Sequence, residues 1–142
     1  MHKLKRLLLL LPVGLPSLAL ADSINAADTA WILTATALVL FMTIPGLSMF
    51  YAGLVRSKHV LSVFMQCFAI TCLMSLLWFA VGYTMAFGSE GVEQGKWLGD
   101  FGNVFFANIH IDSVKGSIPA TLFAAFQMTF AIITPALIVG GF

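Results

Sequence analysis

The chain has 142 residues, of which 60% are hydrophobic and 9% charged, and its formal net charge at pH 7 is +1. Soluble domains average about 45–50% apolar and about 25% charged residues, so this composition indicates a membrane protein. A net charge close to zero supplies no basic surface, which argues against nucleic acid as a partner.

The first residues are typical of a secretory signal peptide. Lys3, Lys5 and Arg6 precede the apolar run 7–11, and Ala-Leu-Ala at 19–21 has the pattern of a cleavage site. The run is too short and too broken by proline and glycine to span a membrane. We therefore expect cleavage after residue 21. The alternative is an uncleaved anchor, which leaves the topology below unchanged.

Three long stretches of the remaining chain, 29–55, 60–89 and 116–142, carry no charged residue. A helix that spans a bilayer needs roughly 20 apolar residues, and each stretch exceeds that length. None shows the alternation typical of membrane barrel strands. The sequence therefore predicts an all-α integral membrane protein with a domain at 22–142. Its transmembrane helices lie at about 31–55, 61–87 and 117–142, with an external loop at about 88–116.

Charge placement predicts the orientation of these helices. The short turn Arg56–His59 holds two of the four lysine and arginine residues that remain after cleavage, as expected for a cytoplasmic turn. Every acidic residue of the mature chain falls on a segment that this topology places outside. We expect a multi-pass protein of the inner (plasma) membrane, in contact with lipid, whose N-terminus is external after signal cleavage.

The residue types offer no catalytic chemistry. Paired carboxylates, a Ser/His/Asp set and a metal-spaced cluster are not found at one depth, and no predicted helix contains a histidine that could bind haem. We expect a protein that is not an enzyme and that needs no cofactor or metal. What remains is two apolar rows at helical spacing. The third helix carries Phe126, Phe130, Ile133 and Leu137, and the first carries Leu47, Phe50 and Tyr51.

Such rows alone are most often packing or lipid-facing surfaces. Small residues seven or four apart on the first helix, Gly46 with Gly53 and Ser48 with Ala52, suit close helix contact. From these patterns alone we predict a helix bundle with an unusually apolar interior and no buried ions.

A series of short motifs covers nearly the whole chain after residue 21. Phe-Met-Thr-Ile-Pro-Gly-Leu at 41–47 continues as Phe-Tyr-Ala-Gly-Leu-Val-Arg at 50–56 and Ser-Lys-His-Val-Leu-Ser at 57–62. Next come Trp78 with Gly82-Tyr83 and Ala-Phe-Gly at 86–88. The third helix adds two further motifs, at 126–131 and 137–140. In order and spacing these motifs resemble the Amt/Mep/Rh family of ammonium transporters. Ala52 replaces a common glycine and His59 a common asparagine.

This resemblance implies a fold of eleven transmembrane helices in two inverted halves, assembled as a homotrimer with one pore per subunit. Phe126 then matches the aromatic recruitment site at the external mouth, and Phe130 one of two phenylalanines that gate the pore. Hydrophobic lining positions are matched by Leu47, Phe50, Tyr51, Ile133 and Leu137. Gln127, about 100° around the helix from Phe126, is a further candidate for the mouth. The family's paired pore histidines belong to later helices.

The resemblance implies transport of ammonium or ammonia, and a PII-type regulatory protein as a possible partner on the cytoplasmic face. Only the Arg56–His59 turn of that face lies within this sequence. A second interpretation also remains. In it the chain is a non-transporting membrane module, either truncated or ammonium-sensing, that binds a regulatory partner.

Overall fold

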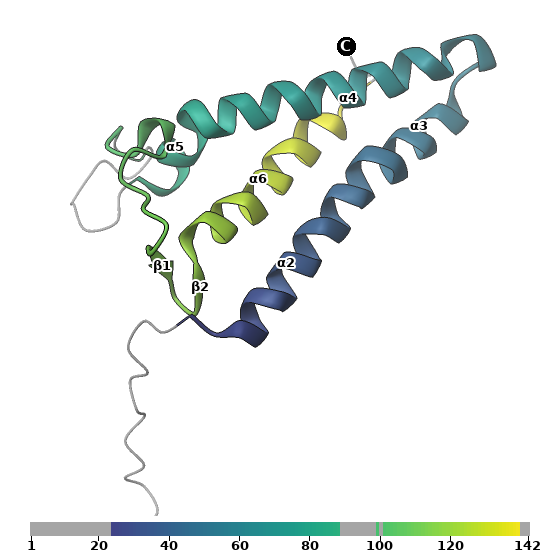
Figure 1. Ribbon diagram of the computed structural model, residues 1–142. Helices are drawn as coiled ribbons and strands as arrows, with labels where there is room; N and C mark the ends of the chain where they lie inside the picture. Colours follow the sequence, from purple (N-terminus) through teal and green to yellow (C-terminus); the bar gives the residue numbers. More distant parts are fainter. Residues whose placement is uncertain (1–23, 89–98, 100, 140–142) are drawn as a thin grey trace, which may run out of the picture.

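The computed structural model describes residues 24–88, 99 and 101–139. The predicted signal peptide at 1–21, part of the predicted loop and the last residues of the predicted third helix lie outside these ranges. The described residues form two long helical rods that meet at a turn, with a shorter helix between them (Figure 1).

The first rod runs without a break from Ala26 to Leu54. It consists of α2 (Ala26–Phe41), the π-helix η1 (Met42–Leu47) and α3 (Ser48–Leu54). The rod begins before the predicted start at 31, because the Asn25 side chain caps it and accepts from the Ala27 and Asp28 amides at 2.9 and 3.3 Å. Asp28 in the first turn also complements the helix dipole.

Pro45 explains the change of helix type within this rod. Proline lacks an amide hydrogen and collides with the preceding turn of an α-helix. The wider π-helical turns of η1 contain Pro45 and carry the chain through it, so that α-helix resumes at Ser48. The Ser48 hydroxyl donates to the Ile44 and Pro45 carbonyls.

The second rod runs from Ser57 to Phe87. It contains the 3₁₀ turn η2 (Ser57–His59), α4 (Val60–Leu77), the π-helix η3 (Trp78–Gly82) and α5 (Tyr83–Phe87). Both rods are long and apolar enough to cross a membrane. The predicted second helix at 61–87 corresponds to this rod without its first turn.

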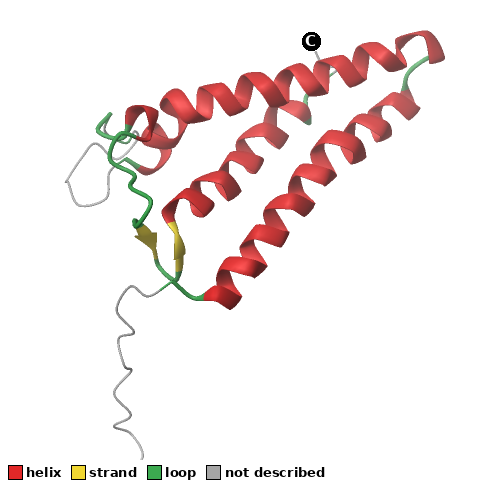
Figure 2. Ribbon diagram, viewed as in Figure 1, coloured by secondary structure: helices red, strands yellow, loops and turns green. Residues whose placement is uncertain are grey.

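The segment that leads to the third helix is not purely irregular, which modifies the all-α prediction. It contains the 3₁₀ turn η4 (Val104–Phe106) and two short antiparallel strands, β1 (Val114–Lys115) and β2 (Ile118–Pro119) (Figure 2). Gly116 lies between the strands with φ of 66°, a left-handed conformation that glycine adopts without strain.

The third helix, α6, spans Ala120–Ala136. It is shorter than the predicted 117–142, and its 17 residues fall below the roughly 20 that a bilayer requires. The hairpin of β1 and β2 occupies the predicted start of the helix, and turn residues follow Ala136. Two hydrogen bonds hold its beginning, from the Ala120 amide to Ser113 O and from the Asn25 amide to Ser117 O, both at 2.8 Å.

The buried part of the bundle is less apolar than predicted. Five of its buried residues are serine or threonine: Thr36, Thr43, Ser48, Thr84 and Thr129. Four of these hydroxyls donate to a carbonyl three or four residues earlier in their own helix, and Thr84 Oγ1 accepts from the Asn103 amide at 3.2 Å. Bonds within one helix make these groups compatible with burial.

Large apolar side chains cover much of the outside of both rods. Trp31 is 73% exposed, Phe41 70% and Leu61 74%. Exposed apolar surface on this scale is unfavourable in water, so lipid or further protein must cover it. The fold is thus that of a membrane protein whose small residues face inward.

Candidate functional site

Helix α6 has two faces of opposite character. The buried face consists of Ala120, Ala124, Thr129, Ile132 and Ala136. On the other side, the predicted row Phe126, Phe130, Ile133 and Leu137 lies within an arc of about 60°, counting 100° per residue. Each member of this row keeps part of its surface exposed. Mostly small residues, together with Ile132, therefore make the helix contacts, and the large side chains of the row face away from them.

Two phenylalanines form the first part of this row. The Phe126 and Phe130 rings lie 5.1 Å apart between centroids and meet edge to face at 85°. Phe126 is half-buried, whereas Phe130 is 43% exposed. Aromatic pairs favour this geometry, in which the edge of one ring meets the electron-rich face of the other. The structure thus brings the two predicted recruitment and gate residues together.

The other end of the row meets the first rod. The Tyr51 hydroxyl of α3 donates to the Leu137 carbonyl at 2.7 Å, and the Phe50 ring lies 5.5 Å from the Tyr51 ring. Phe50 is 62% exposed and Leu137 51%. From Phe126 to Leu137 the row is about 16 Å long at 1.5 Å per residue.

The remaining predicted residues are less closely tied to this row. Leu47 ends η1 one turn before Phe50 and Tyr51 and is half-buried. Ile133 is half-buried between Phe130 and Leu137, and Gln127 is half-buried beside Phe126. The hydrogen bond from Tyr51 to the Leu137 carbonyl joins the predicted residues of the first rod to those of the third helix.

Sequence analysis missed an aromatic cluster around the start of α6. The rings of Trp78, Tyr83 and Phe87 lie 5.5–6.3 Å from one another, and the Phe87 and Phe123 rings are 5.2 Å apart. Trp78 precedes Gly82 by four residues and Tyr83 by five, so all three lie on neighbouring turns of one helix. Their contact with α6 depends on tertiary packing. The only sequence signal is the high density of rings in 78–87 and 123–130.

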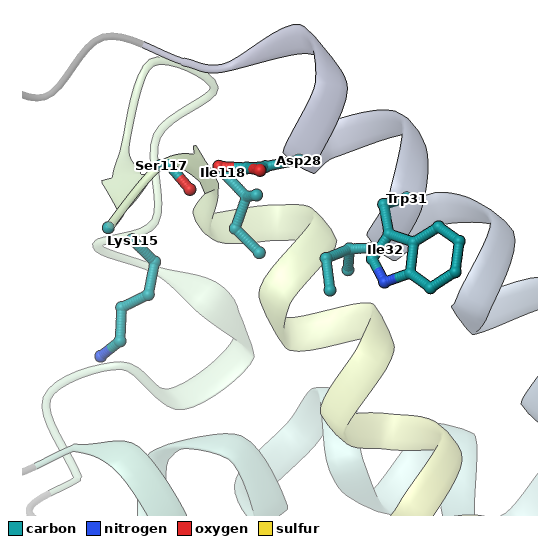
Figure 3. A pocket seen from close by; sticks show the side chains of 7 residues that line it. Asp28, Trp31, Ile32, Lys115, Ser117 and Ile118 are labelled. Atoms are coloured by element: carbon teal, nitrogen blue, oxygen red, sulfur yellow. The ribbon is translucent and has the colours of Figure 1, made fainter.

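A hollow of about 340 Å³ lies elsewhere, between the beginning of α2 and the hairpin. Asp28, Trp31, Ile32, Lys115 and Ser117 are among its lining residues, and the Lys115 side chain extends away from Asp28 (Figure 3). None of the predicted site residues lines it. Across residues 24–88, 99 and 101–139, no three His, Cys, Asp or Glu residues gather in a way that could hold a metal ion.

Comparisons with known proteins agree on one family. The sequence-family model described as Ammonium Transporter Family matches residues 30–142. The chain is 44% identical over 120 residues to a putative ammonium transporter of Methanothermobacter thermautotrophicus, and 40% identical over 126 residues to an ammonium transporter of Aquifex aeolicus. It is 41% identical over 117 residues to an ammonium transporter of Bacillus subtilis.

These matches cover 82%, 84% and 81% of this chain but 28% of each relative. The chain therefore spans a little over a quarter of the length of the curated relatives that it resembles.

Proposed function

Since the chain belongs to the ammonium transporter family, we propose that it forms part of a pathway that carries ammonium, as the ion or as ammonia, across a membrane. In this proposal Phe126 recruits the cation at the external mouth and Phe130 is part of the gate beneath it. The pathway is then lined by Ile133 of α6 and Leu137 directly after it, and by Leu47, Phe50 and Tyr51 of the first rod. Gln127 contributes to the edge of the mouth.

One observation carries this proposal. The row from Phe126 to Leu137 is continuous, apolar and directed away from the packed face of α6. It starts with an aromatic pair and ends where Tyr51 is hydrogen-bonded to the Leu137 carbonyl. The opposite face of α6 makes its contacts with the other helices, so the large side chains of the row remain available to line a pathway that further helices enclose.

The chemistry of the row suits a small cation that can lose its charge. An aromatic face attracts a cation by about 0.5–2 kcal/mol, which offsets part of the cost of dehydration at Phe126. Beyond Phe130 the row is apolar, and moving a charge into the centre of a membrane costs at least about 2.5 kcal/mol. Ammonium avoids that cost by releasing a proton, whereas potassium cannot. The row thus favours passage of ammonia after deprotonation.

The assembly and regulation belong to the same proposal. We infer a homotrimer in the inner membrane with the beginning of α2 outside, and the Arg56–His59 turn on the cytoplasmic side. In this orientation the turn is available to a PII-type regulatory protein. Its residues are all exposed, and Arg56 and Lys58 give it a positive charge. They suit an acidic surface on such a partner.

Uptake measurements test the transport proposal. The complete gene product containing this segment is expressed in cells that lack ammonium uptake, and labelled methylammonium entry is measured in membrane vesicles. We expect Phe126→Ala to weaken uptake at low substrate concentration and Phe130→Ala to change its rate or its selectivity against potassium. Phe41→Ala is the matched control, because Phe41 is an exposed phenylalanine on α2, outside the proposed pathway.

The outcomes separate the interpretations. Uptake that is indifferent to both substitutions would remove Phe126 and Phe130 from the pathway while leaving ammonium transport in place. A protein that reaches the membrane and moves no substrate would refute the transport proposal and favour the ammonium-sensing module. Binding of a PII-type protein to inverted vesicles, with and without ammonium, would then be the next measurement.

A further inference from the structure

Trp78 reaches from the second rod to the backbone of α6. Its indole Nε1–H donates to the Ala124 carbonyl at 3.0 Å, across 46 residues of sequence. Ala124 is fully buried, and a Cβ added to Gly82 would lie 3.0 Å from Trp78 Cε3. The π-helical segment η3 thus places a residue without a side chain beside the indole ring. The absence of a side chain at Gly82 leaves room for the ring, and its hydrogen bond is directed at one turn of α6.

Lys115 makes a second connection to the same turn. Its ammonium group lies 5.2 Å from the centroid of the Phe123 ring and 5.9 Å from that of Phe87. The two rings meet edge to face, with centroids 5.2 Å apart. A cation within about 6 Å of an aromatic face is attracted to it. Because Lys115 belongs to β1 and Phe87 to α5, this contact joins the hairpin and the second rod to α6.

The two connections end on Phe123 and Ala124, which lie three and two residues before Phe126, within one helical turn. Rotation of α6 by about 20° would move a ring at a radius of about 6 Å by roughly 2 Å. Such a shift is large compared with the tolerance of a cation site, where a displacement of about 1 Å already weakens function. A helix end held at two points resists this rotation better than one held by apolar packing alone.

We propose that Trp78 and Lys115 are positioning residues for Phe126. They set the rotation of α6 so that the Phe126 ring faces the incoming cation and stays paired with Phe130. Neither residue touches the substrate in this arrangement. The inference rests on the proposed recruitment role of Phe126, and it adds two residues that lie outside the apolar row.

The test compares uptake kinetics of four variants in vesicles from the complete gene product. Trp78→Phe keeps an aromatic ring and removes the donor, and Lys115→Met keeps the aliphatic stem and removes the charge. We expect each to raise the KM for methylammonium about two- to tenfold, in keeping with the strength of a cation–π contact, at an unchanged maximal rate per protein copy. Lys115→Arg keeps the cation and restores the original KM. Trp31→Phe, at an exposed tryptophan of α2, is the control and leaves KM unchanged.

A double variant shows whether the effect passes through Phe126. In the Phe126→Ala background, Trp78→Phe and Lys115→Met should add no further rise in KM, because the ring that they position is gone. An equal rise in both backgrounds overturns the inference. So does an unchanged KM in both single variants while Phe126→Ala alone raises it, an outcome that leaves the proposed function intact. Absence of uptake in the unsubstituted protein refutes the proposed function and this inference together.

A purely structural role has a different signature. Variants that only lose stability lower the amount of protein in the membrane and the total rate, with KM unchanged. Immunoblots of the same vesicles give the protein amount. A lower amount with an unchanged KM therefore overturns the positioning role, even if the uptake rate falls.

Discussion

The two ends of the helix bundle are held together in different ways. At the hairpin end, where α2 and α6 begin and α5 finishes, rings from Trp78, Tyr83, Phe87 and Phe123 pack together and two connections hold α6 (Figure 1). At the turn end, around the finish of α3 and the start of α4, a small apolar cluster forms instead: Val63, Cys67 and Val139 pack with Tyr51 and Ile70, and the Tyr51 hydroxyl donates to the Leu137 carbonyl.

This difference indicates what each end does in the proposed pathway. Phe126, for which we propose the recruitment role, lies near the hairpin end, and a ring in that role must keep one orientation to attract a cation. The part of the row from Ile133 to Leu137 needs only an apolar surface, which tolerates small movements. The hairpin end therefore fixes geometry through ring contacts and directed bonds, whereas the turn end is held by apolar packing and one hydrogen bond.

The largest loss of stability is expected from Gly99→Ala, at the hairpin end. A Cβ there would overlap the Thr84 carbonyl oxygen and lie 2.9 Å from both Gly88 N and Met85 O. These atoms are backbone and cannot move aside, so the substitution should destabilise the protein by about 3 kcal/mol. Thermal unfolding in detergent measures it. An unchanged Tm would mean that the hairpin end is looser than its contacts indicate.

Ala124→Leu should cost somewhat less, about 2 kcal/mol, because a larger side chain must fit where Ala124 is fully buried. Its matched control is Thr134→Leu, an exposed position of the same helix, where a change within about 0.5 kcal/mol is expected. Equal effects of the two substitutions on the unfolding temperature would contradict the assignment of a packed face and an open face to α6.

Tyr51→Phe removes the hydrogen bond at the turn end and keeps the ring. We expect a loss of about 1 kcal/mol in stability, the usual net contribution of one such bond in a membrane protein or in water. Hydrogen exchange at the end of α6 should rise more than exchange at its beginning. A uniform rise along α6 would show that the two ends are not held independently.

The smallest change in stability, and the only expected increase, is that of Gly53→Ala. A Cβ at Gly53 in α3 meets no atom within 4 Å. Alanine is favoured over glycine in a helix by about 0.5–1 kcal/mol, so the unfolding temperature should rise slightly. If the complete gene product is instead destabilised, another element covers Gly53, and the open surface at this residue belongs to this segment alone.

The helices could be predicted from sequence because the cues are local. Charge-free stretches longer than 20 residues located both rods, and the spacing of Phe126, Phe130, Ile133 and Leu137 predicted a single face that the structure has. The Asn25 cap was missed, since the prediction began at the first long apolar stretch. The end of α6 was predicted too late, because hydropathy continues past Ala136 where the helix gives way to turns. The transport roles of these residues remain predictions.

Other features depend on contacts that no local pattern encodes. The buried hydroxyls were not foreseen, because threonine in an apolar run carries no sign of whether it faces a partner helix. The connections from Trp78 to Ala124 and from Lys115 to Phe123 join residues that the sequence separates or assigns to a loop.

The sequence by itself determined that this chain forms apolar helices, where most of each helix runs, and which family it resembles. These properties follow from composition, charge placement and short motifs, since each residue's transfer into lipid and each helical turn depend on near neighbours. Only the tertiary structure decided which face of α6 is packed and what holds its beginning in place. Those features arise when small residues let helices approach and bring distant rings and carbonyls into contact.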